Sequence, residues 1–222
     1  MMKQNNKMKK IDIKPLFEKE YNSLWETAEK QFPQETLVRN GYDVVNHITK
    51  GALMIVGLNP SIGKEDKPGK FFETITKDSY KYYPPIFEFA ENCGYNEFSY
   101  ADIFAMRCSI QRAIIKNIKE VPGFKDFCKE QFNLFVEIVK LASPSIIVVT
   151  NAYARDRFFD EGKDVFKVIE DNEIGTYRIA GDSELEGVPV FFSGMLGGQH
   201  ALDKGSKKRM EWQIRRIKSC SY

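Results

Sequence analysis

The stretch GALMIVGLNPSIGK occupies residues 51–64 and combines an apolar run with a stiff turn. Its first part, Ala52–Val56, is continuously apolar and is bounded by Gly57. A short run of this kind is typical of a strand buried on both faces, as in a parallel sheet. The next residues include Asn59 and Pro60, and the proline ring biases the asparagine away from helical geometry. The stretch therefore predicts a buried strand with a rigid turn at its carboxyl end.

Further apolar runs alternate with helical patterns along the chain. Strands are predicted at 98–105, 145–150 and 188–194, with a strand or an edge segment at 175–180. Helices are predicted at 15–31, 85–92, 123–142, 151–171 (with a break at Gly162) and 206–218. This alternation predicts an α/β fold, a three-layer α/β/α sandwich with a mostly parallel central sheet.

The length and composition fit one folded domain. The chain has 222 residues, 42% hydrophobic and 29% charged, which excludes global disorder. We expect a flexible basic tail at 1–10 and a single domain over 11–222. No apolar run approaches the roughly 20 residues that a membrane span needs. The first residues show no apolar region of a signal peptide, so we expect a cytoplasmic protein without membrane contact. We also expect the protein to be a monomer.

Metal and nucleoside triphosphate chemistry fit the sequence poorly. The four cysteines include no C-x-x-C pair, and His47 and His200 are the only histidines. Gly57–Lys64 superficially resembles a phosphate-binding loop. However, five residues separate its two glycines where that loop has four, and Glu65 follows the lysine where a serine or threonine would stand. We therefore expect neither a metal nor another cofactor.

The motif GLNPS at 57–61, placed after a buried strand, resembles motif 1 of the uracil-DNA glycosylase superfamily. The similarity in element order extends over about residues 50–218, but only this pentapeptide matches residue by residue. It implies a glycosylase-like α/β fold in which main-chain groups of the motif contact a base. It also implies that the Asn59 side chain positions the attacking water. Gly57, Leu58, Pro60 and Ser61 would then bind substrate.

The resemblance also suggests roles for residues further along the chain. An aromatic ring downstream of the motif stacks on the base in this family, which implies such a role for Phe72 or its neighbour Phe71. A base-recognising side chain ends the next strand, where this chain has Asp102. A carboxylate there accepts hydrogen bonds from an amino-bearing base but lacks the donor of an asparagine amide.

The loop from Ser193 takes the place of the family's second motif and departs from it. Ser193 stands where a histidine is expected, and no proline follows. His200 is the candidate to replace that histidine, and Gly194 permits close approach of the backbone to a ligand. Met195 could wedge between bases. Phosphate-binding residues are then expected near the start of the last helix, namely Gln199, Lys204, Lys207 and Lys208.

Three functions are consistent with these patterns. The first is a metal-independent DNA glycosylase of DNA repair that hydrolyses the N-glycosidic bond of a flipped, damaged or deaminated base. The second is a non-catalytic protein of the same fold that binds a nucleobase, a nucleotide, or single- or double-stranded DNA. The third is an unrelated α/β enzyme that acts on a small metabolite and in which GLNPS is only a turn. Arg107 and Arg112 could bind a phosphate or form ordinary salt bridges.

Overall fold

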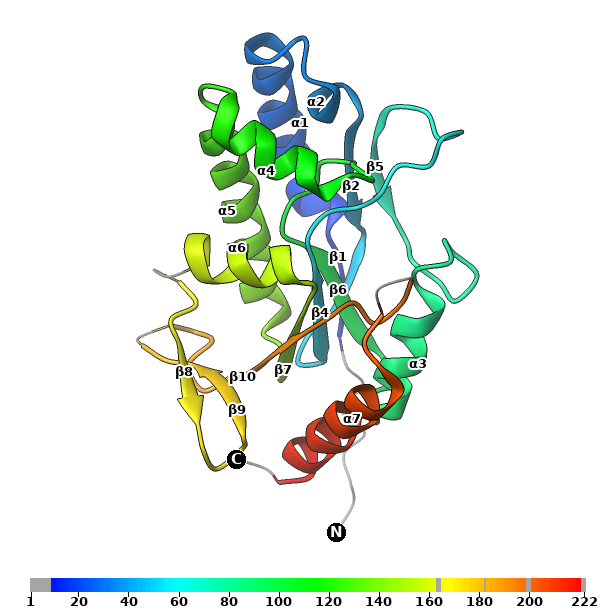
Figure 1. Ribbon diagram of the computed structural model, residues 1–222, viewed down its shortest axis with the longest axis vertical. Helices are drawn as coiled ribbons and strands as arrows, with labels where there is room; N and C mark the ends of the chain where they lie inside the picture. The colour runs from blue at the N-terminus through cyan, green and yellow to red at the C-terminus, as the bar shows by residue number, and fades with distance from the viewer. Residues whose placement is uncertain (1–8, 163–164, 182, 199–200, 221–222) are drawn as a thin grey trace.

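The computed structural model describes residues 9–162, 165–181, 183–198 and 201–220. The side chains of residues 160 and 161 also lie outside this description. The chain forms a mixed α/β fold around a six-stranded, mostly parallel sheet with the strand order β6-β4-β7-β10-β9-β8 (Figure 1). This confirms the predicted α/β class and the mostly parallel character of the sheet.

Four parallel strands form the part of the sheet that positions the cavity described below. They are β4 (Leu53–Gly57), β6 (Phe98–Asp102), β7 (Ile146–Thr150) and β10 (Pro189–Ser193). β4 comes first in the chain but lies between the second and the third of them, β6 and β7. The connections that leave β4 and β7 therefore diverge. Such a change of direction opens a crevice at the carboxyl ends of strands.

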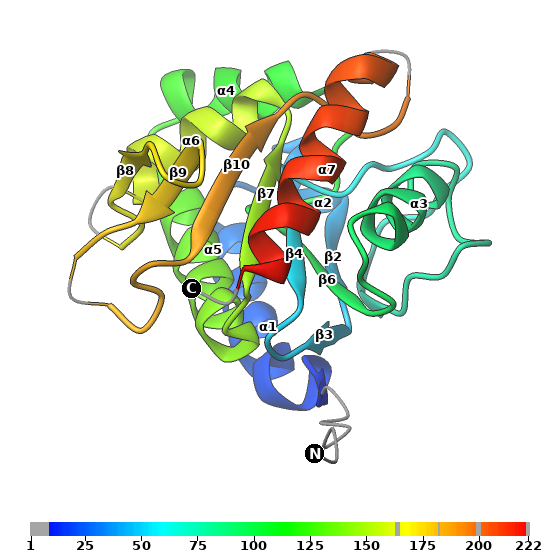
Figure 2. The ribbon, with the colours of Figure 1, turned by 90° about the horizontal axis from the view of Figure 1, so that it is seen from below.

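Each face of the sheet has its own apolar core because successive strand residues point to opposite sides. Met54 and Val56 of β4 pack with α1 and α5 in one core, whereas Leu53 and Ile55 pack with α3 and α7 in the other. Figure 2 shows α5 on one side of the strands and α3 and α7 on the other. This two-sided burial explains why the strands are continuous apolar runs.

The helices follow the predicted periodicities closely. Those expected from the sequence are α1 (Lys14–Gln31), α3 (Pro84–Asn92), α5 (Phe124–Ala142), α6 (Ala152–Gly162) and α7 (Lys204–Ser219). Two shorter helices were not predicted, α2 (Thr36–Arg39) and α4 (Gln111–Glu120). The Asp203 carboxylate caps α7 by accepting hydrogen bonds from the backbone of Gly205 and Ser206.

The prediction of one broken helix over 151–171 is wrong beyond Gly162. The chain there forms β8 (Val168–Asp171), which turns back into the antiparallel β9 (Thr176–Ile179). Gly175 has φ +68 in the connecting turn, a conformation that favours glycine. Pairing between neighbouring segments therefore overrides the helical pattern.

Two small sheets were also missed. β1 (Lys10–Asp12) pairs with β3 (His47–Thr49), and β2 (Gly41–Val45) pairs with β5 (Gly69–Glu73) in parallel. β1 begins inside the expected flexible tail, of which residues 1–8 lie outside the described part of the chain. Within the described residues no helix is long and apolar enough to cross a membrane.

Candidate functional site

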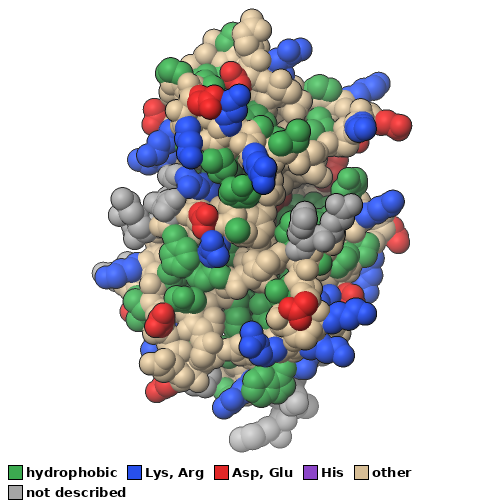
Figure 3. Space-filling model, viewed as in Figure 1, with side chains coloured by type: hydrophobic (Ala, Val, Ile, Leu, Met, Phe, Trp, Pro, Cys, Tyr) green, Lys and Arg blue, Asp and Glu red, His purple; other side chains and the backbone are tan. Residues whose placement is uncertain are grey.

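A cavity of about 790 Å³ opens at the carboxyl ends of the four parallel strands. Figure 3 views the molecule from the side of Figure 1, where the surface is hollowed near its centre. The wall includes Leu58–Ser61 after β4, Asp102 at the end of β6, Asn151 after β7, and Met195 and Gly198 after β10. The GLNPS turn and the loop after the last strand therefore line the same cavity.

Backbone hydrogen bonds hold the GLNPS turn against the segment that follows β6. The amides of Ile103, Phe104 and Cys108 donate to the carbonyls of Gly57, Leu58 and Pro60 at 3.0, 2.8 and 2.9 Å. The Ser109 hydroxyl further exchanges hydrogen bonds with the backbone of Ile62. The two strand ends thus continue side by side as one rigid rim of the cavity.

The Asn59 side chain fastens this turn from inside. Its Nδ2 donates to the carbonyl oxygens of Pro60 and Cys108 at 2.9 and 2.7 Å, and to that of Met106 at a longer 3.4 Å. Because carbonyls only accept, these partners fix which way the amide points. Oδ1 is buried and has no hydrogen-bond partner among the described residues. In this conformation the NH2 group of the Asn59 amide stabilises the turn, and the amide oxygen is shielded from any water in the cavity.

The loop after β10 contributes Met195 and Gly198 to the wall, but Ser193 and Gly194 do not reach it. The Ser193 carbonyl accepts a hydrogen bond from the amide of Asn151 at 2.9 Å, which ties β10 to the end of β7. Its hydroxyl oxygen is buried without a partner among the residues that the structure describes. Gln199 and His200 lie outside the described residues.

The structure does not bring Phe72 to the cavity wall. Its ring packs against Tyr21 and Tyr42 with centroid distances of 6.0 and 5.7 Å, as part of the core beneath β2 and β5. Phe71 likewise lies outside the wall, where the Arg107 guanidinium stacks over its ring at 4.8 Å. Neither phenylalanine therefore supplies the aromatic ring that was expected at the cavity.

Tyrosines that were not predicted from the sequence line the cavity instead. Tyr82, Tyr83 and Tyr100 line the cavity and pack edge-to-face, with centroid distances from 5.6 to 6.3 Å. Tyr80 and Tyr153 border the same space. Edge-to-face packing fixes the orientation of the three rings relative to one another. The run YKYYPP at 80–85 was the available signal for this wall.

Asp102 lies at the base of the tyrosine cluster. Its Oδ1 accepts a hydrogen bond from the Tyr100 hydroxyl at 3.0 Å. Burial raises the pKa of Asp102 to about 7, the Tyr100 hydrogen bond opposes this shift, and the charge of Asp43 adds to it. Burial and the Asp102 charge also raise the pKa of Tyr100 well above its ordinary value. The site thus holds a carboxyl group that changes charge near neutral pH.

Gly57 makes room for these two side chains. It pairs with Asp102 across β4 and β6, and a Cβ at this glycine would overlap the Asp102 carboxylate and the Tyr100 hydroxyl. The absence of a side chain on β4 therefore allows the polar groups of β6 to lie across the strand end.

Asp43 is a second carboxyl group of the cavity and was not predicted. It lies in β2, and its Oδ1 is buried without a hydrogen-bond partner among the described residues. Burial raises the pKa of Asp43 to about 7, helped by the charge of Glu73 and opposed by that of Arg107. Because the charge of Asp43 also raises the pKa of Asp102, ionisation of one carboxyl group favours the protonated form of the other.

Arg107 and Arg112, the two arginines singled out in the sequence, both border the cavity. Arg107 is only 7% exposed; it donates to the carbonyl of Lys67 at 2.7 Å and lies 3.6 Å from an Asp66 oxygen. Its Nε is buried without a partner within the described part of the structure. Arg112 is exposed at the rim. The pair brings positive charge to a cavity that also holds several carboxylates.

The three lysines of α7 predicted to bind nucleic acid lie outside the cavity wall. Lys204 and Lys208 are exposed, whereas Lys207 pairs with Glu88 of α3 at 3.6 Å. Among the described residues no group of three or more His, Cys, Asp or Glu side chains is arranged to hold a metal ion.

Comparison of this chain with protein-family models, curated proteins and solved structures finds no significant match. The function of the cavity must therefore be inferred from the residues that line it.

Substitution of Gly57 tests how the cavity floor is built. Gly57→Ala is expected to destabilise the protein by about 1–3 kcal/mol, because the new methyl group must displace Asp102 or Tyr100. Gly194→Ala is the control, since the nearest atom to its added Cβ would be 3.8 Å away. Urea unfolding compares the two variants. Equal stability would contradict the close packing at Gly57.

The raised pKa of Asp102 predicts a particular dependence of stability on pH. Between about pH 4 and 7 the unfolded chain loses the Asp102 proton while the folded chain keeps it, so rising pH destabilises the folded state through this group. Asp102→Asn removes the effect. The difference in unfolding free energy between wild type and this variant should fall across that interval and level off on either side. A difference that is constant from pH 4 to 8 would show that Asp102 titrates normally.

Proposed function

We propose that the protein is a uracil-DNA glycosylase-like α/β protein, with the layers of a three-layer α/β/α sandwich, that binds a nucleobase in this cavity and hydrolyses its N-glycosidic bond. The observation that carries the proposal is the meeting of the GLNPS turn, a wall of tyrosines and two shielded carboxyl groups in one cavity at the strand ends. Flat rings suit the tyrosine faces, and the carboxyl groups suit proton transfer near pH 7.

The chemistry falls on Asp43 and Asp102 rather than on Asn59. A base held by Tyr82, Tyr83 and Tyr100 lies beside Asp102, and the sugar then extends toward β2. Asp43, as the carboxylate, takes a proton from water while the water oxygen bonds to the anomeric carbon. The carbon–nitrogen bond breaks, its electron pair stays on the base, and the Asp102 carboxylic acid donates a proton to it. One ionised and one protonated carboxyl group are what two coupled groups with pKa values near 7 provide.

Asn59 then acts as a positioning residue for the turn. Its three carbonyl partners hold the backbone of Leu58–Ser61 at the cavity edge, where main-chain groups can contact the base. DNA with an extruded damaged or deaminated base is the proposed substrate, acted on by a monomer in the cytoplasm without a cofactor, as part of DNA repair.

The test is base release from oligonucleotides that carry uracil, hypoxanthine, xanthine or a thymine mismatch, in single and double strands. Wild type should release at least one base. Asp102→Asn should lower the rate by about 10²–10⁴, the usual worth of a general acid or base, while oligonucleotide binding persists. Asp43→Asn should act similarly, and the double variant should lose less than the two losses combined. Release that is unaffected in both variants, or absent from every substrate, would refute hydrolysis.

A second candidate function is binding of a nucleobase-containing ligand without cleavage. The shielded Asn59 oxygen and the buried Ser193 hydroxyl favour it, because neither motif residue presents its polar atom to the cavity. Quenching of tyrosine fluorescence by nucleotides, with no base release, would select this function over the first.

A further inference from the structure

The solvent face of α7 carries a row of cations around an exposed tryptophan. Lys204, Lys208, Trp212 and Arg216 are spaced four residues apart and are all exposed, so they follow one another along the helix about 6 Å apart. Arg209 is exposed beside this row. Trp212 is 54% exposed, which is unusual for so large an apolar ring. We call these five residues the α7 row.

The charges of the α7 row are not neutralised by neighbouring side chains. Within the described parts of the chain, Lys204, Lys208, Arg209 and Arg216 form no ion pair. Glu211, the only acidic residue in 204–219, points inward, where its carboxylate accepts a hydrogen bond from Asn92. Three other cations of the helix are engaged with α3 or the turn after it, namely Lys207 with Glu88, Arg215 with Asn92 and Lys218 with Gly94. One set of cations on α7 therefore holds the helix against α3 and the turn after it, and another set faces solvent.

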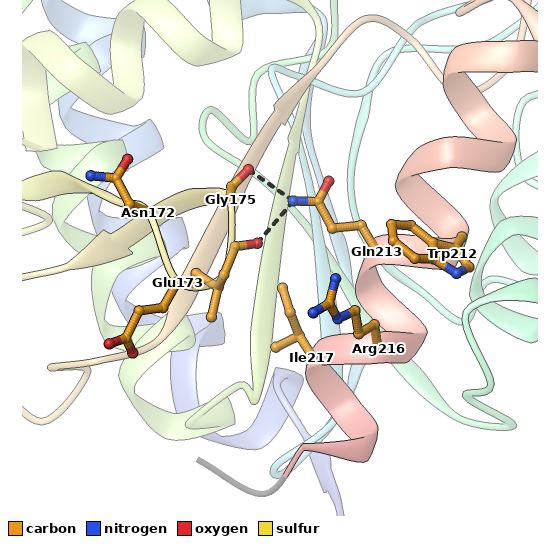
Figure 4. Close-up of a pocket in the computed structure, with 8 residues that line it drawn as sticks. Asn172, Glu173, Gly175, Trp212, Gln213, Arg216 and Ile217 are labelled. Atoms are coloured by element: carbon orange, nitrogen blue, oxygen red, sulfur yellow. Dashed lines mark hydrogen bonds between the residues drawn. The ribbon is translucent and has the colours of Figure 1, made fainter.

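The part of α7 that carries Trp212 is held in place by hydrogen bonds to the turn between β8 and β9. Gln213 donates through Nε2 to the carbonyls of Ile174 and Gly175 at 2.9 and 2.8 Å, which locks α7 to the turn between β8 and β9. Figure 4 shows Gln213 reaching from α7 toward this turn, with Trp212 and Arg216 beside it. The Arg216 guanidinium lies 5.7 Å from the centre of the Trp212 ring. A small hollow of about 210 Å³ between helix and turn is bordered by Trp212, Arg216 and Glu173.

We propose that the α7 row binds a single-stranded nucleic acid, with an unpaired base stacked on Trp212 and phosphates held by Lys204, Lys208, Arg209 and Arg216. Free cations at helical spacing complement a polyanion, and an aromatic ring among them accepts any base face. The inference deepens the proposed function, because the row begins where the loop from the cavity wall enters α7 and so can hold the strand that presents a base.

An anionic membrane is the competing partner for a basic helix, and α7 suits it less well. A helix that lies in a membrane inserts an apolar face, but Met210, Ile214 and Ile217 of α7 are buried against the sheet. Trp212 is then the single large apolar side chain exposed on this helix. Stacking on one base uses such a ring fully, whereas membrane insertion would need several.

The test measures binding of a labelled undamaged oligothymidylate to the full chain, so that it does not depend on hydrolysis. Trp212→Ala is expected to weaken binding on the order of tenfold. Binding should also quench tryptophan emission, and Trp212→Phe should abolish the quenching, because the other tryptophan, Trp25, is fully buried. An oligonucleotide of abasic sites separates stacking from charge, since it should bind wild type and Trp212→Ala equally.

The salt dependence tests the cations. Lys208→Gln with Arg216→Gln should reduce the slope of log affinity against log salt by about 1.4, as expected for two lost phosphate contacts. Lys19→Gln with Lys30→Gln is the matched control, since both lysines are exposed on α1 and the net charge changes equally. The control should bind as wild type does, and Asp102→Asn should retain oligothymidylate binding even where base release is lost.

Equal weakening by the α1 and α7 double variants would overturn the proposal, because it would show only a dependence on net charge. Unchanged binding after Trp212→Ala would also overturn it. So would binding to phosphatidylserine vesicles that Trp212→Ala abolishes, in the absence of oligonucleotide binding. If wild type releases no base from any substrate but still binds oligothymidylate through Trp212, the hydrolytic function is contradicted and the α7 row stands as proposed.

Discussion

The close approach of β4 and β6 at Gly57 is the constraint on which the cavity depends. Because this strand end has no side chain, the Tyr100 hydroxyl and the Asp102 carboxylate can lie across it and bond to each other. Their burial follows from that packing, and the raised pKa of Asp102 follows from the burial. Tyr82 and Tyr83 then pack on Tyr100. The position of the tyrosine rings and the burial of Asp102 therefore both depend on the missing side chain at Gly57.

The second constraint is the binding of the GLNPS turn to the segment after β6. The amide hydrogens of Asn59 are donated to backbone carbonyls, which makes the turn rigid. The same hydrogens are therefore not available to a ligand. The motif therefore contributes shape and main-chain groups to the cavity. The carboxyl groups of the cavity wall come from other strands, Asp102 from β6 and Asp43 from β2. In this conformation the motif does not present the Asn59 amide oxygen to the cavity.

The sequence predicts those parts of the fold that are locally encoded. β4, β7 and β10 are continuous apolar runs because both of their faces are covered, and GLNPS and Met195 reach the cavity because they follow such strands. Asp43 could not be found in this way, since GYDVV resembles an ordinary loop or edge strand and reaches the cavity through pairing with β5. The partners of the Asn59 amide are equally invisible, because two of them lie 47 and 49 residues away. Phe72 shows the converse error, because its distance from GLNPS along the chain predicted a ring in the cavity. The ring packs in the core against Tyr21 and Tyr42 instead.

The most direct test of the central claim is a carbon-13 titration of the aspartate carboxyl groups, with Asp102→Asn to assign the resonance, in the absence and presence of free nucleobases. We expect Asp102 to titrate near pH 7, and we expect at least one base to shift both its midpoint and the ring resonances of Tyr82, Tyr83 and Tyr100. A midpoint near pH 4 that no base alters would contradict it, since the carboxyl group would then be an ordinary solvated one and the cavity would hold no heterocycle.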